Sequence, residues 1–195
     1  MGFSPLRAGV AFLPLTAALF GMSRTAPRLM PRLGAKPLMI AGMLPAIVSL
    51  AWLSRVSPAT GYWSGVFGPM MLLGIGMGLV FVPLTTASLA GVAPTDSGAA
   101  SSMVTVMQQV GGTLGLAVLV AVYGTASRNA LLHPQPGLTV AAQGQHVLAH
   151  GMAAAFGFAA ILDVASLLVI LAFIRTRRLR PQRVEVREQE PAIAS

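Results

Sequence analysis

Five apolar stretches, separated by more polar segments, divide the 195-residue chain. A helix that spans a membrane needs about 20 predominantly apolar residues, and each stretch reaches this length or approaches it with its polar flanks. The stretches predict transmembrane helices over residues 8–23, 37–54, 63–90, 101–124 and 151–174. Residues 175–195 mix Arg, Glu and Pro and are expected to form a disordered basic tail. The pattern therefore predicts an all-α integral membrane protein with about five spanning helices.

Composition supports this fold class. Apolar residues make up 55% of the chain and charged residues only 9%, whereas a soluble domain has about 25% charged residues. A folded soluble chain with so few charges could not cover its surface with polar groups, but apolar side chains that face lipid remove this conflict. The chain has no Cys, which excludes disulfides and thiolate metal sites.

The positive charges indicate an orientation. The chain has 13 Lys and Arg residues and a net charge of +8. Most of the 13 lie in two segments, residues 24–36 and 175–187, which a five-helix chain places on the same side of the membrane. The positive-inside rule makes that side cytoplasmic. The sequence therefore predicts a multi-pass protein of the cell membrane, in contact with the lipid bilayer, with its C-terminus in the cytoplasm and its N-terminus outside.

Nucleic-acid binding, a signal peptide and a metal site are each less favoured by the sequence. No aromatic residues are interleaved with the basic clusters, so a nucleic-acid partner is not expected. No small-residue cleavage site follows the first stretch, which argues against a signal peptide. His133, His146 and His150 are irregularly spaced and have no accompanying carboxylate. We therefore interpret residues 128–150 as a solvated external loop rather than a metal site, and predict no cofactor.

Two pairs of glycines four residues apart indicate close helix packing. Gly74 and Gly78 lie in the third stretch, and Gly111 and Gly115 lie in the fourth. Glycines with this spacing lie on one face of a helix and allow two backbones to approach each other. The glycine-rich segment of the third stretch lacks the Lys and the spacing of a phosphate-binding loop, so we predict helix-packing sites.

Prolines interrupt the first three stretches and leave two alternatives open. They are Pro14, Pro45, Pro69 and Pro83. Each removes a backbone hydrogen bond and can kink its helix, as in transporters that gate through broken helices. Proline is also common in membrane helices without such a role.

Polar side chains are concentrated in the third and fourth stretches. Thr105, Gln108 and Gln109 lie in the fourth stretch, and Thr85 lies in the third. Two adjacent glutamines are costly against lipid, so we expect them to face protein or water. Hydrogen bonds between helices and a lining of a substrate passage explain them equally well.

The acidic residues do not form a catalytic site. None of the five Asp and Glu residues pairs with another inside a predicted span, and no nucleophile or zinc motif is present. An enzyme is therefore not expected. Asp163 is the only charged residue within an apolar stretch. It is either a proton or cation site or a carboxyl group hydrogen-bonded to a neighbouring helix, and we favour the second interpretation.

Four segments of the chain resemble a known transporter family, the drug:proton antiporter-2 family, which is the fourteen-helix branch of the major facilitator superfamily. They are SPLRAGVAFLPL at residues 4–15, APRLMPRLGAKPLMIAGM at 26–43, GIGMGLVFVPLTTASLAGVAPTDSGAASS at 74–102, and QQVGGTLGLAVL at 108–119. They occur in the order of the family and cover most of residues 4–119.

The resemblance implies that the chain is a C-terminal fragment. The five predicted helices would be the last five of the C-terminal six-helix bundle. The missing helices would belong to the same protein or to a separate chain. The resemblance also places a cytoplasmic gating motif in the first loop, on Arg28, Arg32, Gly34 and Lys36. The Asp that is usual in this motif is absent.

The resemblance further implies a function and site residues. The first, third and fourth predicted helices would line the passage, with Thr85, Thr105, Gln108 and Gln109 as candidate lining residues. The helix with Asp163 would be peripheral. The expected function is proton-coupled efflux of drugs or other amphipathic compounds, with a small-molecule substrate and the proton as partners. The alternatives are export of another metabolite class, or a truncated membrane component without transport activity of its own.

Overall fold

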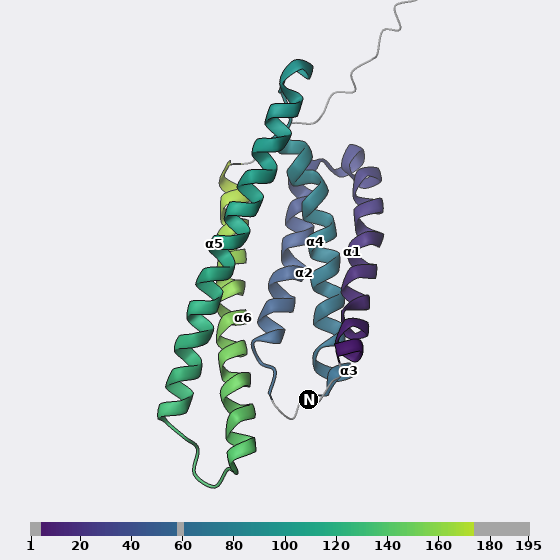
Figure 1. The fold of residues 1–195 in the computed structure, drawn as a ribbon. Helices are drawn as coiled ribbons and strands as arrows, with labels where there is room; N and C mark the ends of the chain where they lie inside the picture. Colours follow the sequence, from purple (N-terminus) through teal and green to yellow (C-terminus); the bar gives the residue numbers. More distant parts are fainter. Residues whose placement is uncertain (1–4, 58–60, 174–195) are drawn as a thin grey trace, which may run out of the picture.

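The computed structural model describes residues 5–57 and 61–173, and every regular element in these ranges is helical. The elements, in chain order, are α1 (Pro5–Leu33), α2 (Ala35–Leu53), α3 (Tyr62–Gly65), α4 (Phe67–Ser88), the 3₁₀ turn η1 (Pro94–Asp96), α5 (Ser97–Leu132) and α6 (Val140–Phe173). Figure 1 shows the long helices running roughly side by side. The predicted all-α fold is confirmed. The predicted tail, residues 175–195, lies outside the described residues.

Four of the long helices could cross a membrane by length and composition: α2, α4, α6, and α5 together with η1. The remaining long helix, α1, has 29 residues but includes Arg7, Arg24, Arg28 and Arg32. A chain with four such helices in succession is a multi-pass membrane protein.

Some helices extend further than the apolar pattern predicts. α1 continues to Leu33, so most of the segment expected to be a loop is helical, and Gly34, with φ of 84°, separates it from α2. The external loop expected over residues 128–150 is reduced to residues 133–139. The extensions are rich in Ala, Leu, Arg and Gln, which have high helix propensity. Polar residues end the apolar run there, but they do not end the helix.

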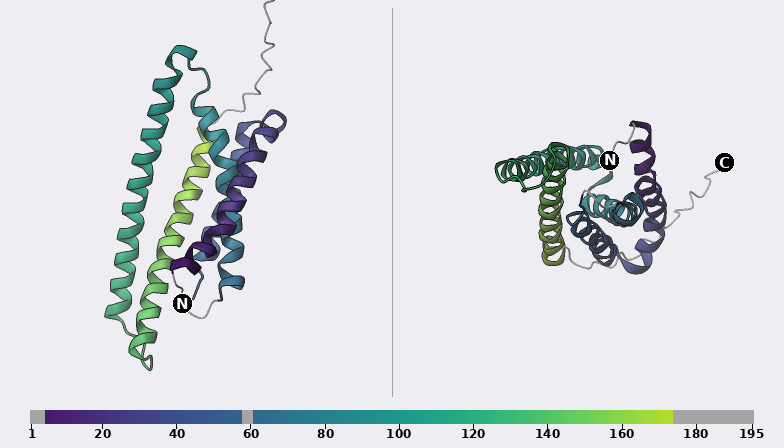
Figure 2. Two further views of the ribbon diagram at one scale, coloured as in Figure 1. Left: turned by 45° about the vertical axis from the view of Figure 1, so that its right-hand side comes forward. Right: turned by 90° about the horizontal axis from the view of Figure 1, so that it is seen from below.

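The helices form two groups, one made of α1 to α4 and one made of α5 and α6. α4 packs against both α1 and α2, and α6 packs against α2 on one side and α5 on the other. Figure 2 shows α5 standing apart from α1 and α4. We call the end of the bundle that holds Gly34 the Gly34 end, and the end with the α5–α6 connection the Gly137 end, because Gly137 has a φ of 84° there. α5 and α6 separate towards the Gly34 end.

Glycines bring α4 close to its two neighbours. A Cβ atom at Gly78 would lie 2.7 Å from Cβ of Met22 in α1, and one at Gly74 would collide with the carbonyl oxygen of Leu15. On the other side, a Cβ atom at Gly76 would lie 2.6 Å from the carbonyl oxygen of Gly42 in α2. Side chains larger than hydrogen would therefore push α4 away from α1 and α2.

Side-chain hydrogen bonds also link different helices. Ser49 Oγ donates to the carbonyl oxygen of Pro69 at 2.6 Å and is fully buried between α2 and α4. Tyr62 Oη donates to the carbonyl oxygen of Ala11 at 2.7 Å, which fixes α3 against α1. Lys36 Nζ donates to the carbonyl oxygen of Leu171 in α6 at 2.8 Å. The last bond joins the two groups of helices.

Candidate functional site

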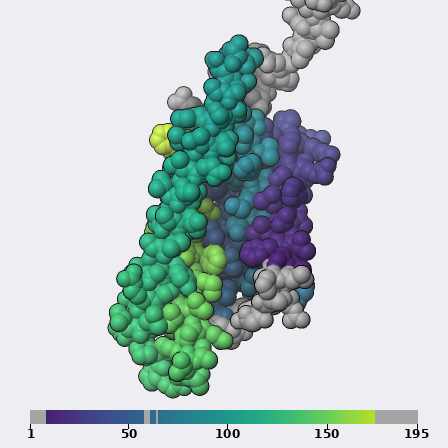
Figure 3. All heavy atoms as spheres, viewed as in Figure 1, coloured from purple at the N-terminus to yellow at the C-terminus, as the bar shows by residue number. Residues whose placement is uncertain are grey.

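A groove of about 450 Å³ opens between α1, α4 and α6, towards the Gly137 end of the bundle. Its wall is almost entirely apolar, and it includes the end of α2 and the residues that follow. The lining residues are Phe12, Leu15, Leu53, Val56, Ser57, Val66, Met70, Leu73, Gln145, Leu148, Ala149, Met152, Ala153 and Phe156. The space-filling view in Figure 3 shows the molecule hollowed between α1 and the α5–α6 pair.

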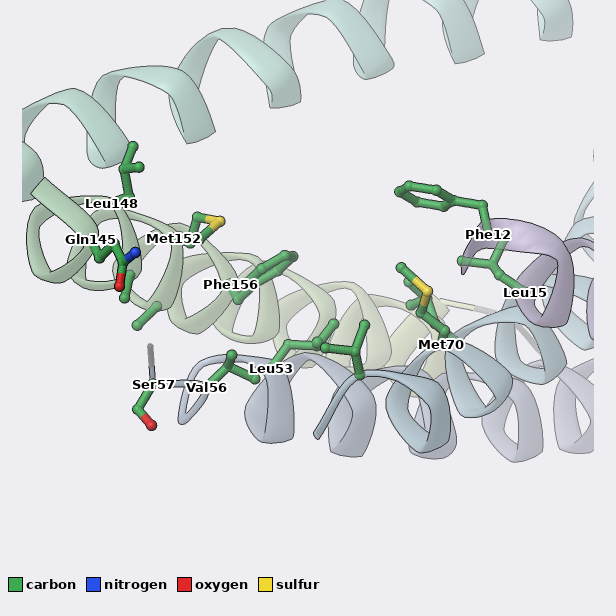
Figure 4. Close-up of a pocket in the computed structure, with 14 residues that line it drawn as sticks. Phe12, Leu15, Leu53, Val56, Ser57, Met70, Gln145, Leu148, Met152 and Phe156 are labelled. Carbon is green, nitrogen blue, oxygen red and sulfur yellow. The ribbon is translucent and has the colours of Figure 1, made fainter. Parts of the chain in front are cut away.

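The close-up in Figure 4 shows how the walls face each other. Phe156 and Met152 extend from α6, Met70 extends from α4, and Phe12 lies on the opposite side on α1. Aromatic rings and thioethers adapt to ligands of different shape, and Met in particular has three rotatable bonds and a polarizable sulfur. The groove can therefore accept an apolar partner but offers few polar groups to one.

One face of α6 forms a continuous wall. Gln145, Ala149, Met152 and Phe156 follow each other at intervals of three or four residues, which is the spacing of one helix face. Asp163 lies seven residues after Phe156, about two turns further on. It is therefore on the same face, closer to the Gly34 end.

Asp163 is partly buried. It forms no hydrogen bond and no ion pair within residues 5–57 and 61–173. The neighbouring-helix partner expected for this carboxyl group is therefore not among the described residues.

The four candidate passage residues do not line the groove. Thr85 and Thr105 each bond to their own helix, with Oγ1 donating to the carbonyl oxygens of Phe81 at 2.9 Å and Ser101 at 3.0 Å. Gln108 and Gln109 are exposed. The structure thus places Thr85 on α4 and the other three on α5, and does not bring them together around a described cavity.

The direction of two of these side chains follows from helical spacing. Ala130 is the only buried residue of α5, and it lies beside the α6 histidines His146 and His150. Gln108 precedes Ala130 by 22 residues, about six turns, and Thr105 precedes it by 25, about seven turns. Both therefore lie on the side of α5 that faces α6 at the Gly137 end, but α5 and α6 have separated at their level.

The candidate gating residues lie at the Gly34 end. Arg28 and Arg32 are on the last turns of α1, one turn apart, and are exposed. Gly34 forms the break between α1 and α2. Lys36 reaches α6, where its Nζ donates to the carbonyl oxygen of Leu171.

The candidate packing glycines differ between helices. Gly74 and Gly78 meet α1 through the close contacts given for the fold, whereas Gly111 and Gly115 have open space where a Cβ atom would stand.

The three histidines gather at the Gly137 end. The rings of His146 and His150 stack with centroids 6.2 Å apart, and His133 Nδ1 lies 3.0 Å from the carbonyl oxygen of Asn129. Among the described residues, no group of three or more His, Cys, Asp or Glu side chains is arranged to hold a metal ion. The structure gives no geometric basis for metal chemistry in this part of the chain.

The groove residues were not predicted from the sequence. Phe12, Met70 and Phe156 are apolar residues within apolar stretches, and a residue that faces a groove has the same sequence signal as one that faces lipid. The 3–4 spacing on α6 was the available signal, but it does not identify which face is lined by protein.

Comparison with known proteins identifies relatives of the chain. It matches no protein-family model. It is 38% identical over 129 residues to a cephamycin export protein from Amycolatopsis lactamdurans, a match that covers 65% of this chain and 26% of the relative. It is 35% identical over 179 residues to a puromycin resistance protein from Streptomyces alboniger, covering 89% of this chain and 34% of the relative.

A third relative extends the match further along the chain. An MFS-type transporter from Bacillus subtilis is 30% identical over 185 residues, covering 94% of this chain and 35% of the relative. The chain therefore spans about a quarter to a third of the length of these relatives. The relatives are transport and resistance proteins by name, and none of these three is named as an enzyme.

Proposed function

Because this chain belongs to the major facilitator superfamily of transporters, we propose that it is the C-terminal part of a protein that exports drugs or other amphipathic compounds in exchange for protons. The observation that carries the proposal is the similarity to exporters along most of the chain. The membrane-length helices support it. The partial coverage of the relatives supports the view that the chain works as part of a longer assembly.

Thr105, Gln108, Gln109 and Thr85 are the proposed contacts to the transported compound. By helical spacing, Thr105 and Gln108 lie on the side of α5 that faces α6 at the Gly137 end. Amide and hydroxyl groups can hydrogen-bond an amphipathic compound without a fixed charge, which suits a passage that accepts different substrates. Removal of these groups is expected to lower transport more than insertion.

The Gly34 end is proposed to face the cytoplasm. Arg24, Arg28, Arg32 and Lys36 all lie at this end, and so does the last described residue of α6, Phe173. The positive-inside rule favours this orientation. A reporter fused after Ser195 should be active only in the cytoplasm, and one inserted near Gln143 only outside. Activity of both reporters on one side would contradict the proposed topology.

Arg28, Arg32, Gly34 and Lys36 are proposed to act in gating, since a break between two helices with charges on both sides can respond to movement of the bundle. The double substitution Arg28→Glu and Arg32→Glu in a longer transporter should disturb topology or transport. Normal insertion and transport by this variant would mean that the two arginines are dispensable surface charges.

A second possibility is favoured by the coverage of the relatives. The chain alone could be a membrane component without transport activity, because helices from two bundles usually enclose a transport passage in such proteins. Export of another metabolite class would leave the same helices and orientation, and only the transported compound would differ.

The experiment compares the chain with a chimera. In the chimera, the region of the Streptomyces puromycin resistance protein that precedes its matched segment is fused before Pro5. Each protein is reconstituted into vesicles with an imposed proton gradient, and transport of puromycin is measured against protein-free vesicles. The chimera should transport until a protonophore collapses the gradient, and the chain alone should not. An inserted but inactive chimera would contradict the proposed export, and transport by the chain alone would contradict the need for a longer assembly.

A further inference from the structure

A pocket of about 340 Å³ lies at the Gly137 end, where α5 and α6 come together (Figure 2). We call it the histidine pocket, and its lining residues are Asn129, Ala130, His133, His146 and His150. The Nδ1 atom of His146 is buried and has no hydrogen-bond partner among the described residues. A buried polar nitrogen without a partner costs free energy. The pocket is therefore suited to a ligand that carries hydrogen-bonding atoms.

The charges around the histidine pocket favour an anion. Arg128 directly precedes Asn129. The only acidic side chains among the described residues are Asp96 and Asp163. At 1.5 Å per helical residue, Asp96 is about 50 Å from Asn129, and Asp163 is about 20 Å from His150. No described carboxylate therefore reaches the pocket, whereas imidazole and amide N–H groups there can donate hydrogen bonds to an anion such as phosphate.

A second hollow, of about 500 Å³, continues from the histidine pocket along α5. We call it the α5 furrow, and its lining residues are Val118, Ala121, Val122, Thr125, Ala126, Asn129 and His150. It shares Asn129 and His150 with the histidine pocket. Thr125 Oγ1 donates to the carbonyl oxygen of Ala121 at 2.9 Å, so its proton is already used. The furrow is thus apolar along α5 and offers donors only where it meets the histidine pocket.

The α5 furrow crosses the level at which the apolar stretch of α5 ends. The stretch ends near Gly124. From Val118 to Gly124 the helix advances about 9 Å, and from Gly124 to Asn129 about 8 Å further. The polar headgroup layer on each side of a bilayer is about 5–8 Å thick. The apolar part of the furrow therefore lies at the depth of acyl chains, and Asn129 lies at the depth of phosphate groups.

We propose that the histidine pocket and the α5 furrow together bind one phospholipid with a net negative headgroup, from the leaflet at the Gly137 end. Its phosphate group accepts hydrogen bonds from Asn129 and His150, and one acyl chain lies along the α5 furrow. Basic pockets between membrane helices bind anionic headgroups in this way. The proposal goes beyond the proposed function and does not depend on transport.

The two hollows select this ligand over others that carry phosphate. A free phosphate ester could occupy the histidine pocket but would leave the apolar α5 furrow empty. A zwitterionic phospholipid would fill both hollows, but its ammonium group would lie close to Arg128 and would find no described carboxylate. A net negative headgroup with an acyl chain satisfies both hollows.

Lipid retention by the purified protein tests the charge preference. The full chain is exchanged into mild detergent with equal amounts of phosphatidylglycerol and phosphatidylcholine, and bound lipid is counted by native mass spectrometry. One favourable charge interaction at a membrane surface corresponds to about a fivefold preference, so phosphatidylglycerol should be retained by at least that factor. Equal retention of the two lipids would overturn the proposal.

A double variant tests the polar groups that the two hollows share. Asn129→Leu with His150→Leu removes two donors to a charged group, so retained phosphatidylglycerol should fall at least about tenfold. The matched control is Gln135→Leu, at an exposed residue of the α5–α6 connection that lines neither hollow. It should retain the lipid as the unsubstituted chain does. Unchanged retention by the double variant, at unchanged helicity, would overturn the assignment of the phosphate site.

A second pair of variants tests the α5 furrow and leaves the histidine pocket intact. Ala121→Trp fills the furrow. Val120→Trp places the same side chain on another face of α5, at a position that is 59% exposed. Only Ala121→Trp should lower retention of phosphatidylglycerol. Equal retention by the two variants would mean that no acyl chain lies in the furrow, and would overturn the proposal.

Competition and the longer assembly separate the remaining occupants. Glycerol 3-phosphate carries the phosphate without acyl chains and should not displace phosphatidylglycerol. Displacement as complete as that by added phosphatidylglycerol would overturn the proposal, since the site would then recognise a free phosphate ester. The chimera with the puromycin resistance protein should show the same lipid preference as the chain alone. Its loss in the chimera would overturn the proposal as well, because protein rather than lipid would then cover the two hollows.

Discussion

Two helices, α4 and α5, each contain a pair of glycines spaced four residues apart, but only the pair in α4 contacts another helix. Gly74 and Gly78 in α4 bring its backbone against Leu15 and Met22 of α1. Gly111 and Gly115 in α5 have the same spacing, yet among the described residues a Cβ atom at either position would meet no atom of another helix within 4 Å. Small residues permit a close approach, but a helix must be present to make it.

The two groups of helices also differ in how many of their residues are buried. α1, α2 and α4 carry most of the buried residues, including Leu38, Met39 and Leu79. α5 has one buried residue. The first group is therefore held by its own packing, whereas α5 packs mainly against α6.

The largest expected effect concerns the two glycine pairs. Gly78→Leu would force a side chain into the backbone of α1, where the carbonyl oxygen of Leu19 lies 2.8 Å from the Cβ position. We expect the free energy of unfolding in detergent to fall by about 3 kcal/mol. The matched control, Gly111→Leu in the isolated chain, should change it by no more than about 0.5 kcal/mol. Similar losses for both variants, measured by denaturant titration of helicity, would mean that α5 is packed in the isolated chain as tightly as α4.

A smaller effect is expected where the two groups of helices meet. Lys36 Nζ donates to the carbonyl oxygen of Leu171, beside a cluster of Met39, Met43 and Ile170. Lys36→Met removes the charged donor but keeps an apolar stem, and should weaken the α2–α6 contact by about 1 kcal/mol. Lys36→Arg, which keeps the charge, should retain most of it. The separation of spin labels on α2 and α6 near the Gly34 end would report the change, and an unaltered distance distribution in Lys36→Met would show that the apolar cluster alone holds the contact.

The helices were largely predictable from the sequence, and their ends were not. Apolar runs identify α4 and α6 because lipid selects against charge along a membrane crossing. The sequence pattern predicts loops for the C-terminal half of α1 and the start of α6, because Arg28 and Gln143 are polar. Water outside the bilayer allows a helix to continue with polar side chains, so the end of hydrophobicity does not mark the end of helical structure.

The candidate site was predictable in part. Helical spacing gives the side of α5 on which Thr105 and Gln108 lie. It does not give their partners, because α5 separates from α6 at their level. The groove itself was not predictable, since Phe156 in its wall and Ile161 outside it are both apolar residues of one stretch. The distinction depends on how distant helices are arranged, which no local pattern contains.

A substitution of Ser49 would test how much a single buried hydrogen bond contributes to the packing of α2 against α4. Its hydroxyl is fully buried and donates to the carbonyl oxygen of Pro69 at 2.6 Å. Hydrogen bonds between membrane helices contribute about 0.6 kcal/mol on average. Ser49→Ala should therefore lower the free energy of unfolding by about that amount, with helicity unchanged in native conditions. A loss as large as that of Gly78→Leu would mean that this single bond, rather than the glycine contacts, determines the α2–α4 packing.

The smallest effect is expected at Asp163, an acidic side chain within the membrane-length helix α6. An acidic residue at the centre of a membrane helix costs about 2.5–3.5 kcal/mol on insertion scales, so its presence requires a compensating interaction. The carboxyl group either carries the transported proton or hydrogen-bonds a neighbouring helix of the longer assembly. Asparagine keeps the hydrogen bonds but cannot carry a proton. In the chimera, Asp163→Asn should therefore retain proton-driven puromycin efflux within about twofold of the unsubstituted protein, a difference of about 0.4 kcal/mol. Loss of coupled efflux by this variant, at normal insertion and protein level, would make Asp163 a proton site.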